Sequence, residues 1–122
     1  MMCSKILIVD DSNIVLSLHE YILAGAGYQC ATAENGYIAL ELLLREQFHM
    51  VITDVNMPKM DGYELTRRIR STDGYRDMPV IMISTEEEAL DRVKGMEAGA
   101  NVYLVKPTQP AALVTKVKML LA

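Results

Sequence analysis

The sequence is poor in cysteine and has no long apolar segment, and both shortages narrow its possible classes. Cys3 and Cys30 lack the spacing of metal-ligating cysteines, so we expect two reduced thiols that pack as small apolar side chains. No apolar run approaches the roughly 20 residues that span a bilayer, so we expect no membrane insertion. The N-terminal region has no signal-peptide pattern, because it soon reaches the charged Lys5 and then acidic residues. We therefore expect a cytoplasmic protein.

An excess of basic charge is also missing. The chain has 12 Lys and Arg against 16 Asp and Glu, a formal net charge of −4. Nucleic acid is therefore not attracted to it in general, and we expect no direct nucleic-acid binding. The 122 residues are 51% hydrophobic and 23% charged, which excludes disorder and suffices for one domain with a substantial core. The sequence has no repeat, low-complexity tract or internal linker, so residues 1–122 are expected to form that domain.

Short apolar runs alternate with segments of helical periodicity along the whole chain. This alternation is typical of βα units around a parallel sheet. Periodicity alone does not separate a buried strand from a buried helix, but the β-branched residues and flanking turn residues favour strands. The predicted strands are residues 5–9, 29–33, 50–53, 80–83 and 102–105. The predicted helices run from near 12 to 25, over 37–46, from after 62 to about 70, over 87–98 and over 111–121.

Each predicted helix should turn an apolar stripe toward the sheet. The expected inward residues are Ile14, Leu18, Tyr21 and Ile22 on the first helix, Ile38, Leu42 and Leu43 on the second, and Leu113, Val117, Leu120 and Leu121 on the last. His19 and His49 have no metal-ligand or nucleophile partner nearby in the sequence. We therefore expect both histidines at the surface or at an edge.

Four of the predicted strands end at polar residues of the kind that handle phosphate. These residues are Asp10 with Asp11, Asp54, Ser84 with Thr85, and Lys106. Carboxyl ends of parallel strands meet along one edge of a sheet, which is the usual binding crevice of such folds. Clustered carboxylates repel one another and favour a hard divalent cation such as Mg²⁺. An ammonium and a hydroxyl nearby suit the oxygens of a phosphoryl group.

Each of these residues also has a purely structural interpretation. Asp10 and Asp11 can begin the first helix, Asp54 can be a loop residue, and Ser84 can cap the fourth helix. Taken singly, the structural interpretation is preferable for Ser84 and for Lys106 and about equal for the acids. Taken together it fails, because four independent coincidences would have to fall on one edge of one sheet.

Three stretches resemble the receiver domain of two-component response regulators. They are Val9-Asp10-Asp11, the eleven residues from Ile52 to Gly62, and Leu104-Val105-Lys106-Pro107. The resemblance covers essentially the whole chain. It implies an α/β fold with a doubly wound, parallel five-stranded sheet in (βα)5 arrangement, flavodoxin-like and CheY-like, in the strand order 2-1-3-4-5.

The same resemblance implies a phosphoacceptor and a metal site. Asp54 would attack the phosphohistidine of a sensor histidine kinase or histidine phosphotransfer protein and become an acyl phosphate. Asp11 and Asp54 would bind Mg²⁺ directly, with the backbone carbonyl of Asn56 as a further ligand and Asp10 acting through a water. Phosphoryl transfer needs positioning and charge neutralisation more than covalent assistance, which suits these residues. The chain would be a switch rather than a turnover enzyme.

Other residues receive switching roles from the resemblance. Lys106, before an expected cis bond to Pro107, and the Ser84 hydroxyl would hold phosphoryl oxygens. Tyr103 would then turn inward and change the face made by the fourth helix, fifth strand and fifth helix for a downstream protein target. Three residues would tune hydrolysis of the phosphorylated form: Asn56, Thr85 and Glu86. Candidates for kinase specificity are Asn13, Ile14, Ser17 and Thr108.

Rival functions and contexts stay open at this point. A phosphatase of the haloacid dehalogenase type would need an acid where Asn56 stands, and a longer chain. A flavodoxin-like FMN carrier would bind phosphate after the first strand, where Asp10 and Asp11 would repel it. A degenerate receiver that serves only for docking would lack an essential residue. Within the receiver family, the alternatives are a stand-alone regulator, which we favour, the input domain of a larger regulator such as a DNA-binding one, or a phosphorelay intermediate.

Overall fold

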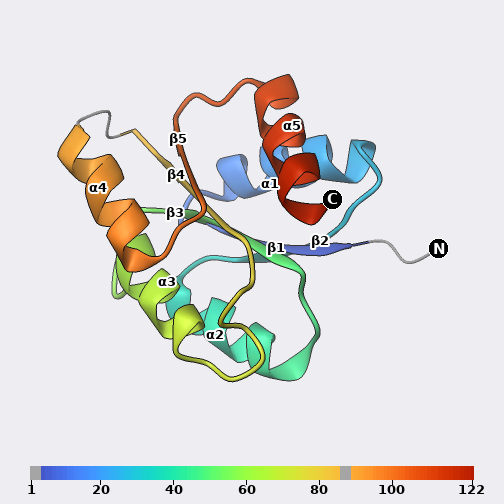
Figure 1. The fold of residues 1–122 in the computed structure, drawn as a ribbon. Helices are drawn as coiled ribbons and strands as arrows, with labels where there is room; N and C mark the ends of the chain where they lie inside the picture. Colours follow the sequence, from blue (N-terminus) through green and yellow to red (C-terminus); the bar gives the residue numbers. More distant parts are fainter. Residues whose placement is uncertain (1–3, 86–88) are drawn as a thin grey trace.

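Strands and helices alternate along the chain as predicted. The computed structural model describes residues 4–85 and 89–122 (Figure 1). Within these ranges it has five strands and five helices. In chain order they are β1 (Lys5–Val9), α1 (Asn13–Gly25), β2 (Gln29–Ala33), α2 (Gly36–Arg45), β3 (Met50–Asp54), α3 (Gly62–Arg70), β4 (Val80–Ser84), α4 (Ala89–Ala98), β5 (Val102–Val105) and α5 (Pro110–Leu121). Cys3, Glu86 and the predicted first two residues of the fourth helix lie outside the described residues.

The strands form one parallel sheet in the order β2-β1-β3-β4-β5, which confirms the predicted order. The register aligns their carboxyl ends. Val9 of β1 pairs with Thr53 of β3, Asp54 with Ile83 of β4, and Ser84 with Val105 of β5. The residues that close β3 and β4, and those that follow β1 and β5, therefore reach one edge of the sheet.

Helices cover both faces of the sheet, because successive side chains of a strand point to opposite faces. Ile6 and Ile8 of β1 face α1 and α5, whereas Leu7 and Val9 face α2 and α3. Apart from the buried residues on these two faces, a further buried cluster lies under α4 and includes Met82 of β4 (Figure 1). All five side chains are at most 1% exposed. Burying a side chain of this size stabilises a fold by roughly 1.5–3 kcal/mol.

The predicted inner stripe of α1 is wrong for three of its four residues. Ile14 is 82% exposed, Leu18 53% and Tyr21 80%, whereas Ile22 is partly buried and packs against the core as predicted. The buried residues of α1 are Leu16, His19 and Leu23. This helix is apolar around most of its circumference, so periodicity allowed two stripes. The predicted position of His19 at the surface or an edge is wrong too, because its side chain is 6% exposed.

The other helices agree better with their predicted stripes. On α2, Leu43 is buried and Leu42 is partly buried against the core, but Ile38 is 39% exposed and does not belong to the inner face. On α5, Leu113 and Val117 are fully buried. The last two predicted residues, Leu120 and Leu121, pack against the same core cluster. His49, partly buried beside β1, accepts a hydrogen bond at Nδ1 from the backbone N–H of Lys5 at 2.9 Å.

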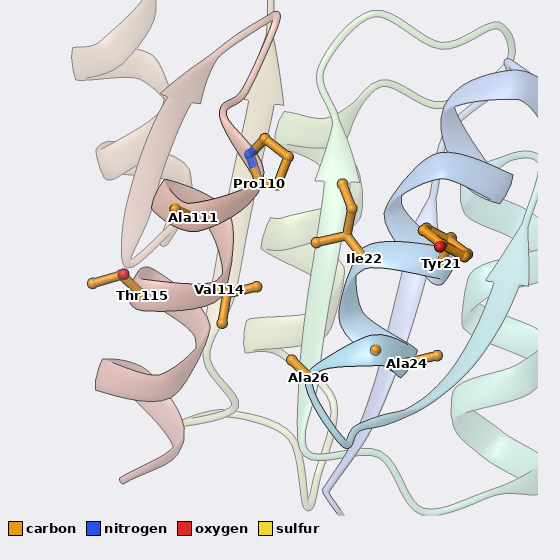
Figure 2. A pocket seen from close by; sticks show the side chains of 9 residues that line it. Tyr21, Ile22, Ala24, Ala26, Pro110, Ala111, Val114 and Thr115 are labelled. Atoms are coloured by element: carbon orange, nitrogen blue, oxygen red, sulfur yellow. The ribbon is translucent and has the colours of Figure 1, made fainter.

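An apolar groove of about 840 Å³ lies between α1 and α5. Figure 2 shows Ile22 and Ala26 of the α1 segment on one side, with Pro110 and Val114 of α5 on the other. Tyr21 stands at the outer end of the α1 side. The lining residues carry no charged group. No helix among the described residues is long and apolar enough to cross a membrane.

Replacing His19 with Leu should make the fold less sensitive to acid. Burial lowers the pKa of His19 from its ordinary value of 6.5; nearby Asp10 opposes this shift and Lys106 adds to it. The neutral imidazole therefore stabilises the wild type above pH 6.5, and this contribution is lost as the pH falls through the lower folded pKa. Urea unfolding between pH 8 and pH 5 measures the effect. Parallel free-energy curves for wild type and His19→Leu would contradict it.

Candidate functional site

Three carboxylates meet at the carboxyl edge of the sheet. Asp10 follows β1, Asp11 comes next, and Asp54 is the last residue of β3. Their carboxylate oxygens lie within 4.8 Å of one another. Asp10 and Asp54 are buried, while Asp11 is exposed. The strand-end prediction is therefore confirmed for the placement of these residues, because neighbouring parallel strands in register bring them to one point.

Lys106 bridges two of these carboxylates from the end of β5. Its Nζ lies 2.9 Å from Oδ2 of Asp10 and 3.2 Å from Oδ1 of Asp54. The remaining oxygen of Asp10 accepts a hydrogen bond of 2.9 Å from the backbone N–H of Ser12. Ser12 also caps α1 by accepting from the N–H of Val15 at 3.3 Å. Both oxygens of Asp10 are thus held, and the start of α1 is tied to the site.

The charges of this cluster are not balanced by Lys106 alone. Burial raises the pKa of Asp54, the charge of Asp10 raises it further, and Lys106 and the N–H of Val55 counteract only part of this. Burial also opposes the charge of Lys106, but its bonds and charge interactions with Asp10 and Asp54 raise its pKa overall. A charged Lys106 beside a disfavoured carboxylate on Asp54 leaves a site that gains from a further cation.

The donor set fits Mg²⁺. Mg²⁺ prefers oxygen ligands, is held by one or two carboxylates, and retains several waters. Asp54 and Asp11 offer carboxylate oxygens here, and the exposed side of Asp11 leaves space for water. Asn56, also exposed, follows Asp54 by two residues and offers a backbone carbonyl in the loop after β3. Hard oxygen donors without nitrogen or sulfur are the appropriate chemistry for this ion.

Gly62 is a site residue that the sequence interpretation missed. Its N–H donates to the carbonyl of Val55 at 2.8 Å. A Cβ at this position would lie 2.3 Å from the carbonyl oxygen of Asp54 and 3.0 Å from Cα of Val55. The first residue of α3 therefore rests directly on the backbone of the candidate phosphoacceptor. The Asp-Gly pair at 61–62 is a turn signal in the sequence, but the close approach needs the folded chain.

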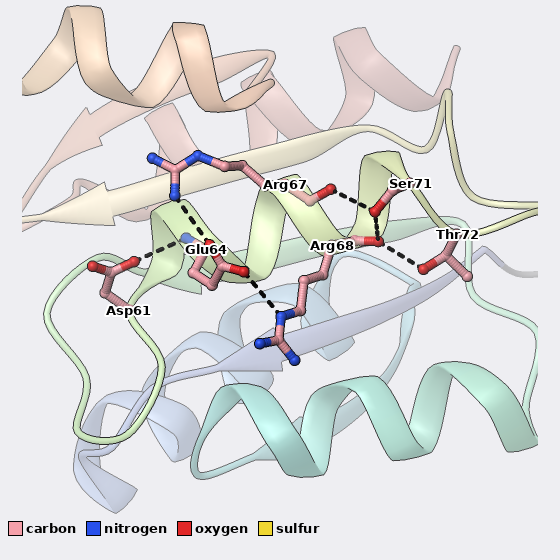
Figure 3. A network of polar contacts seen from close by, with 6 residues as sticks. All are labelled: Asp61, Glu64, Arg67, Arg68, Ser71 and Thr72. Atoms are coloured by element: carbon pink, nitrogen blue, oxygen red, sulfur yellow. Dashed lines mark hydrogen bonds and ion pairs between the residues drawn. The ribbon is translucent and has the colours of Figure 1, made fainter.

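The start of α3 is held firmly against β3. Asp61 accepts a hydrogen bond of 2.8 Å from the N–H of Glu64, which caps the helix (Figure 3). Thr66, fully buried, donates its hydroxyl to the carbonyl of Gly62 at 2.8 Å. Farther along, Glu64 pairs with two arginines, Arg67 and Arg68, on the exposed face of the helix (Figure 3). Capping and buried hydrogen bonds thus keep Gly62 in place.

The remaining predicted residues occupy different positions around the site. Ser84 is fully buried at the end of β4, and its carbonyl accepts from the N–H of Lys106 at 2.7 Å. Thr85 is exposed and lines a cavity of about 330 Å³ with Lys106 and Pro107. The Lys106–Pro107 bond is cis, as the resemblance implied. Tyr103 is 6% exposed, which is an inward position beneath α4.

The chain belongs to the response regulator receiver family. The family model, described as the response regulator receiver domain, matches residues 6–118. Receiver domains are phosphoacceptor switches of two-component signalling; histidine kinases phosphorylate them, and they bind Mg²⁺ at an acidic pocket. Among curated proteins, the chain is 38% identical over 116 residues to the "Probable transcriptional regulator ycf27" of Cyanidium caldarium. That match covers 95% of this chain and 45% of the relative, so the chain spans about half the length of such relatives.

Solved structures agree with the family assignment. The chemotaxis protein CheY4 of Vibrio cholerae has a TM-score of 0.94 and 34% identity, with 98% of this chain and 100% of that chain covered. The receiver domain of the sensor histidine kinase PA1611 from Pseudomonas aeruginosa has a TM-score of 0.90 and 28% identity, with 98% of each chain covered. That structure has a magnesium ion coordinated in its active site cleft.

Replacing Gly62 with Ala should destabilise the fold strongly. The new Cβ would collide with the backbone of Asp54, which cannot move aside as a flexible side chain would. We expect a loss of at least about 3 kcal/mol in the free energy of unfolding, at the upper end of overpacking effects. Gly25→Ala is the matched control, because a Cβ there meets nothing within 4 Å. Its expected effect is no more than about 1 kcal/mol. Equal urea midpoints for the two variants would contradict the close-approach interpretation.

Proposed function

We propose that this chain is a phosphorylation-dependent switch in which Asp54 accepts a phosphoryl group from a phosphohistidine. The observation that carries the proposal is the bridge from Lys106 to Asp10 and Asp54 within a cluster of three carboxylates. A cation held against a buried carboxylate, with room for a second cation, is the charge arrangement that phosphoryl transfer needs. The proposed partner is a sensor histidine kinase or a histidine phosphotransfer protein.

In the proposed reaction, a carboxylate oxygen of Asp54 attacks phosphorus. The P–N bond to the donor imidazole breaks, its electron pair stays on nitrogen, and an acyl phosphate forms on Asp54. Asp11, Asp54 and the carbonyl of Asn56 would hold Mg²⁺, with Asp10 acting through a water; the bound ion would neutralise charge on the phosphoryl oxygens. Lys106 exchanges its bond to Asp54 for one to a phosphoryl oxygen. The Ser84 hydroxyl binds another oxygen.

Switching is proposed to run through the β4–β5 end of the sheet. Ser84 closes β4, and Tyr103 lies on the neighbouring β5 beneath α4. Phosphorylation adds roughly 1.5 to 2 negative charges and strong acceptors, which favours the state in which Tyr103 is inward. The face of α4, β5 and α5 would then bind a downstream protein. Three exposed apolar residues of α4 support this role: Leu90, Val93 and Met96.

Two properties of the proposed switch stay predictions. Asn56, Thr85 and Glu86 would set the lifetime of the phosphorylated form, since polar groups there can orient a water and Thr85 adds bulk beside the site. Residues 1–122 would act as one receiver unit. A stand-alone regulator fits the full coverage of CheY4. The input domain of a longer regulator is the alternative that the twofold longer ycf27 relatives favour.

The outward face of α1 offers an apolar docking surface beside the site. Ile14, Leu18 and Tyr21 form an exposed apolar stripe that the core does not use. Leu18 also lines the small cavity shared with Lys106 and Thr108. A phosphohistidine donor must bring its imidazole to Asp54. Apolar contacts with the neighbouring α1 can position the donor for this step. We propose that this stripe, with Asn13, Ser17 and Thr108, selects the kinase.

The phosphoacceptor assignment is tested with a small phosphodonor and Mg²⁺. Intact mass should show one phosphoryl adduct on the wild type and none on Asp54→Asn, because the amide cannot form the acyl phosphate. Asp73→Asn is the matched control, since that side chain is 95% exposed and belongs to the segment between α3 and β4, outside the carboxylate cluster. Chelation of the metal, or Asp11→Ala, should greatly reduce the adduct. No adduct on the wild type, or equal adducts on wild type and Asp54→Asn, would overturn the proposal.

The docking proposal is tested by Ile14→Ser. Phosphotransfer from a panel of purified histidine kinases should slow about fivefold or more for the cognate kinase, as expected when a central apolar contact is lost. Labelling by the small phosphodonor should not change, because the site itself is intact. Leu44→Ser on α2 is the control: Leu44 is 81% exposed, against 82% for Ile14. Equal slowing by both variants would show that the stripe on α1 has no special role.

A further inference from the structure

We infer that Tyr63 is a positioning residue that links the backbone of Asp54 to the buried side chain of Tyr103 and to α4. The inference rests on the proposed function and adds a second connection from the site to Tyr103 and α4. Ser84 connects the site to the neighbouring strand, whereas Tyr63 connects it through the first turn of α3. Three sets of contacts lead to this conclusion.

The first set of contacts links Tyr63 to the proposed phosphoacceptor, Asp54, through the backbone of the preceding residue, Gly62. Tyr63 follows Gly62, which lies against the carbonyl of Asp54 and donates to the carbonyl of Val55 at 2.8 Å. Thr66 holds the same turn from inside the helix. Because no side chain separates Gly62 from the backbone of β3, a shift of Asp54 must move the start of α3 with it. Tyr63 is the next residue in that turn.

The second contact joins Tyr63 to α4 and β5. Its hydroxyl donates to the carbonyl of Asp91 at 3.4 Å. The pKa of Tyr63 is raised to about 12, mainly by burial, with smaller contributions from the neighbouring Tyr103, Asp91 and Asp61. The ring of Tyr63 packs against the cluster that contains Tyr103 and Val55. One phenol therefore contacts α4 through its hydroxyl and the buried cluster around Tyr103 of β5 through its ring.

The third set of contacts encloses Tyr103. A Cβ on Gly95 of α4 would lie 2.9 Å from Cδ2 of Tyr103 and 3.1 Å from Sδ of Met82, so only glycine leaves room for this ring without displacement. The guanidinium of Arg92 lies 5.4 Å from the ring centroid and donates to the carbonyl of Tyr103 at 3.2 Å. Tyr63 adds the contact from α3. The inward ring is thus contacted from two helices, α4 and α3.

Coupling follows from this arrangement. If the hydroxyl of Tyr63 favours the inward state of Tyr103, then occupancy of the site and burial of Tyr103 stabilise each other through it. Removing the hydroxyl while keeping the ring should weaken this coupling without removing the site. The state with Tyr103 outward should become about three- to tenfold more populated, the effect of one lost hydrogen bond.

The experiment measures exposure of Tyr103 in wild type and Tyr63→Phe. Tyrosine labelled with ¹³C in the ring reports each phenol by NMR, and a soluble paramagnetic chelate reports its exposure. Spectra are recorded with Mg²⁺ alone and with Mg²⁺ plus beryllofluoride, a stable mimic of the phosphoryl group. We expect higher exposure of Tyr103 in Tyr63→Phe under both conditions. Tyr37→Phe is the control, because Tyr37 is 51% exposed on α2 and its loss should change nothing at Tyr103.

A double-mutant cycle separates coupling from a structural effect. Tyr63→Phe should weaken beryllofluoride binding in the wild-type background and have no further effect in the Tyr103→Phe background. Additive effects, or unchanged exposure of Tyr103 in Tyr63→Phe, would overturn the inference. Mass analysis with the small phosphodonor identifies which idea has failed. No adduct on the wild type refutes the proposed function, whereas a normal adduct with unchanged Tyr103 refutes only the role of Tyr63.

Discussion

The contact of Lys106 with Asp10 and Asp54 is the interaction on which the rest of the site depends. It joins the carboxyl ends of β5, β1 and β3, and so requires those strands to end at the same level along the sheet. Breaking a buried ion pair on one side leaves an uncompensated charge, which in other proteins costs about 3–5 kcal/mol. The surrounding structure serves this constraint: parallel strands in register, a capped α1 that holds Asp10, and α3 resting on β3.

The helices on the two faces of the sheet cover its residues in different ways. On one side α1 and α5 bury the larger aliphatic residues of the sheet but leave an apolar stripe and groove facing outward. On the other side α4 covers a smaller cluster that contains Tyr103 and Gly95, where the ring fits only because a Cβ is absent.

Much of this arrangement could be predicted from local patterns, and the exceptions have physical causes. Strands and their polar ends are visible in the sequence, because alternation and turn chemistry are local, and register then brings Asp10, Asp54 and Lys106 together. The face of α1 was mispredicted because Ile14 and Leu16 are equally apolar, and only packing distinguishes them. Gly62 and Tyr63 were missed because their contacts join distant backbone segments. Nothing in the spacing of residues reports that a Cβ at position 62 would have no room beside the carbonyl of Asp54.

The burial of the Lys106 contact has a consequence for ionic strength. Salt screens charges that water reaches, and it acts weakly on those enclosed by protein. The side chains of Lys106, Asp10 and Asp54 are 19%, 4% and 9% exposed, whereas the Glu64 pairs on α3 involve side chains that are 43% to 57% exposed. An increase in salt will therefore weaken the Glu64 ion pairs on α3 more than the Lys106 contact at the sheet edge. The sheet edge thereby keeps its arrangement over a range of ionic strength that changes the surface pairs.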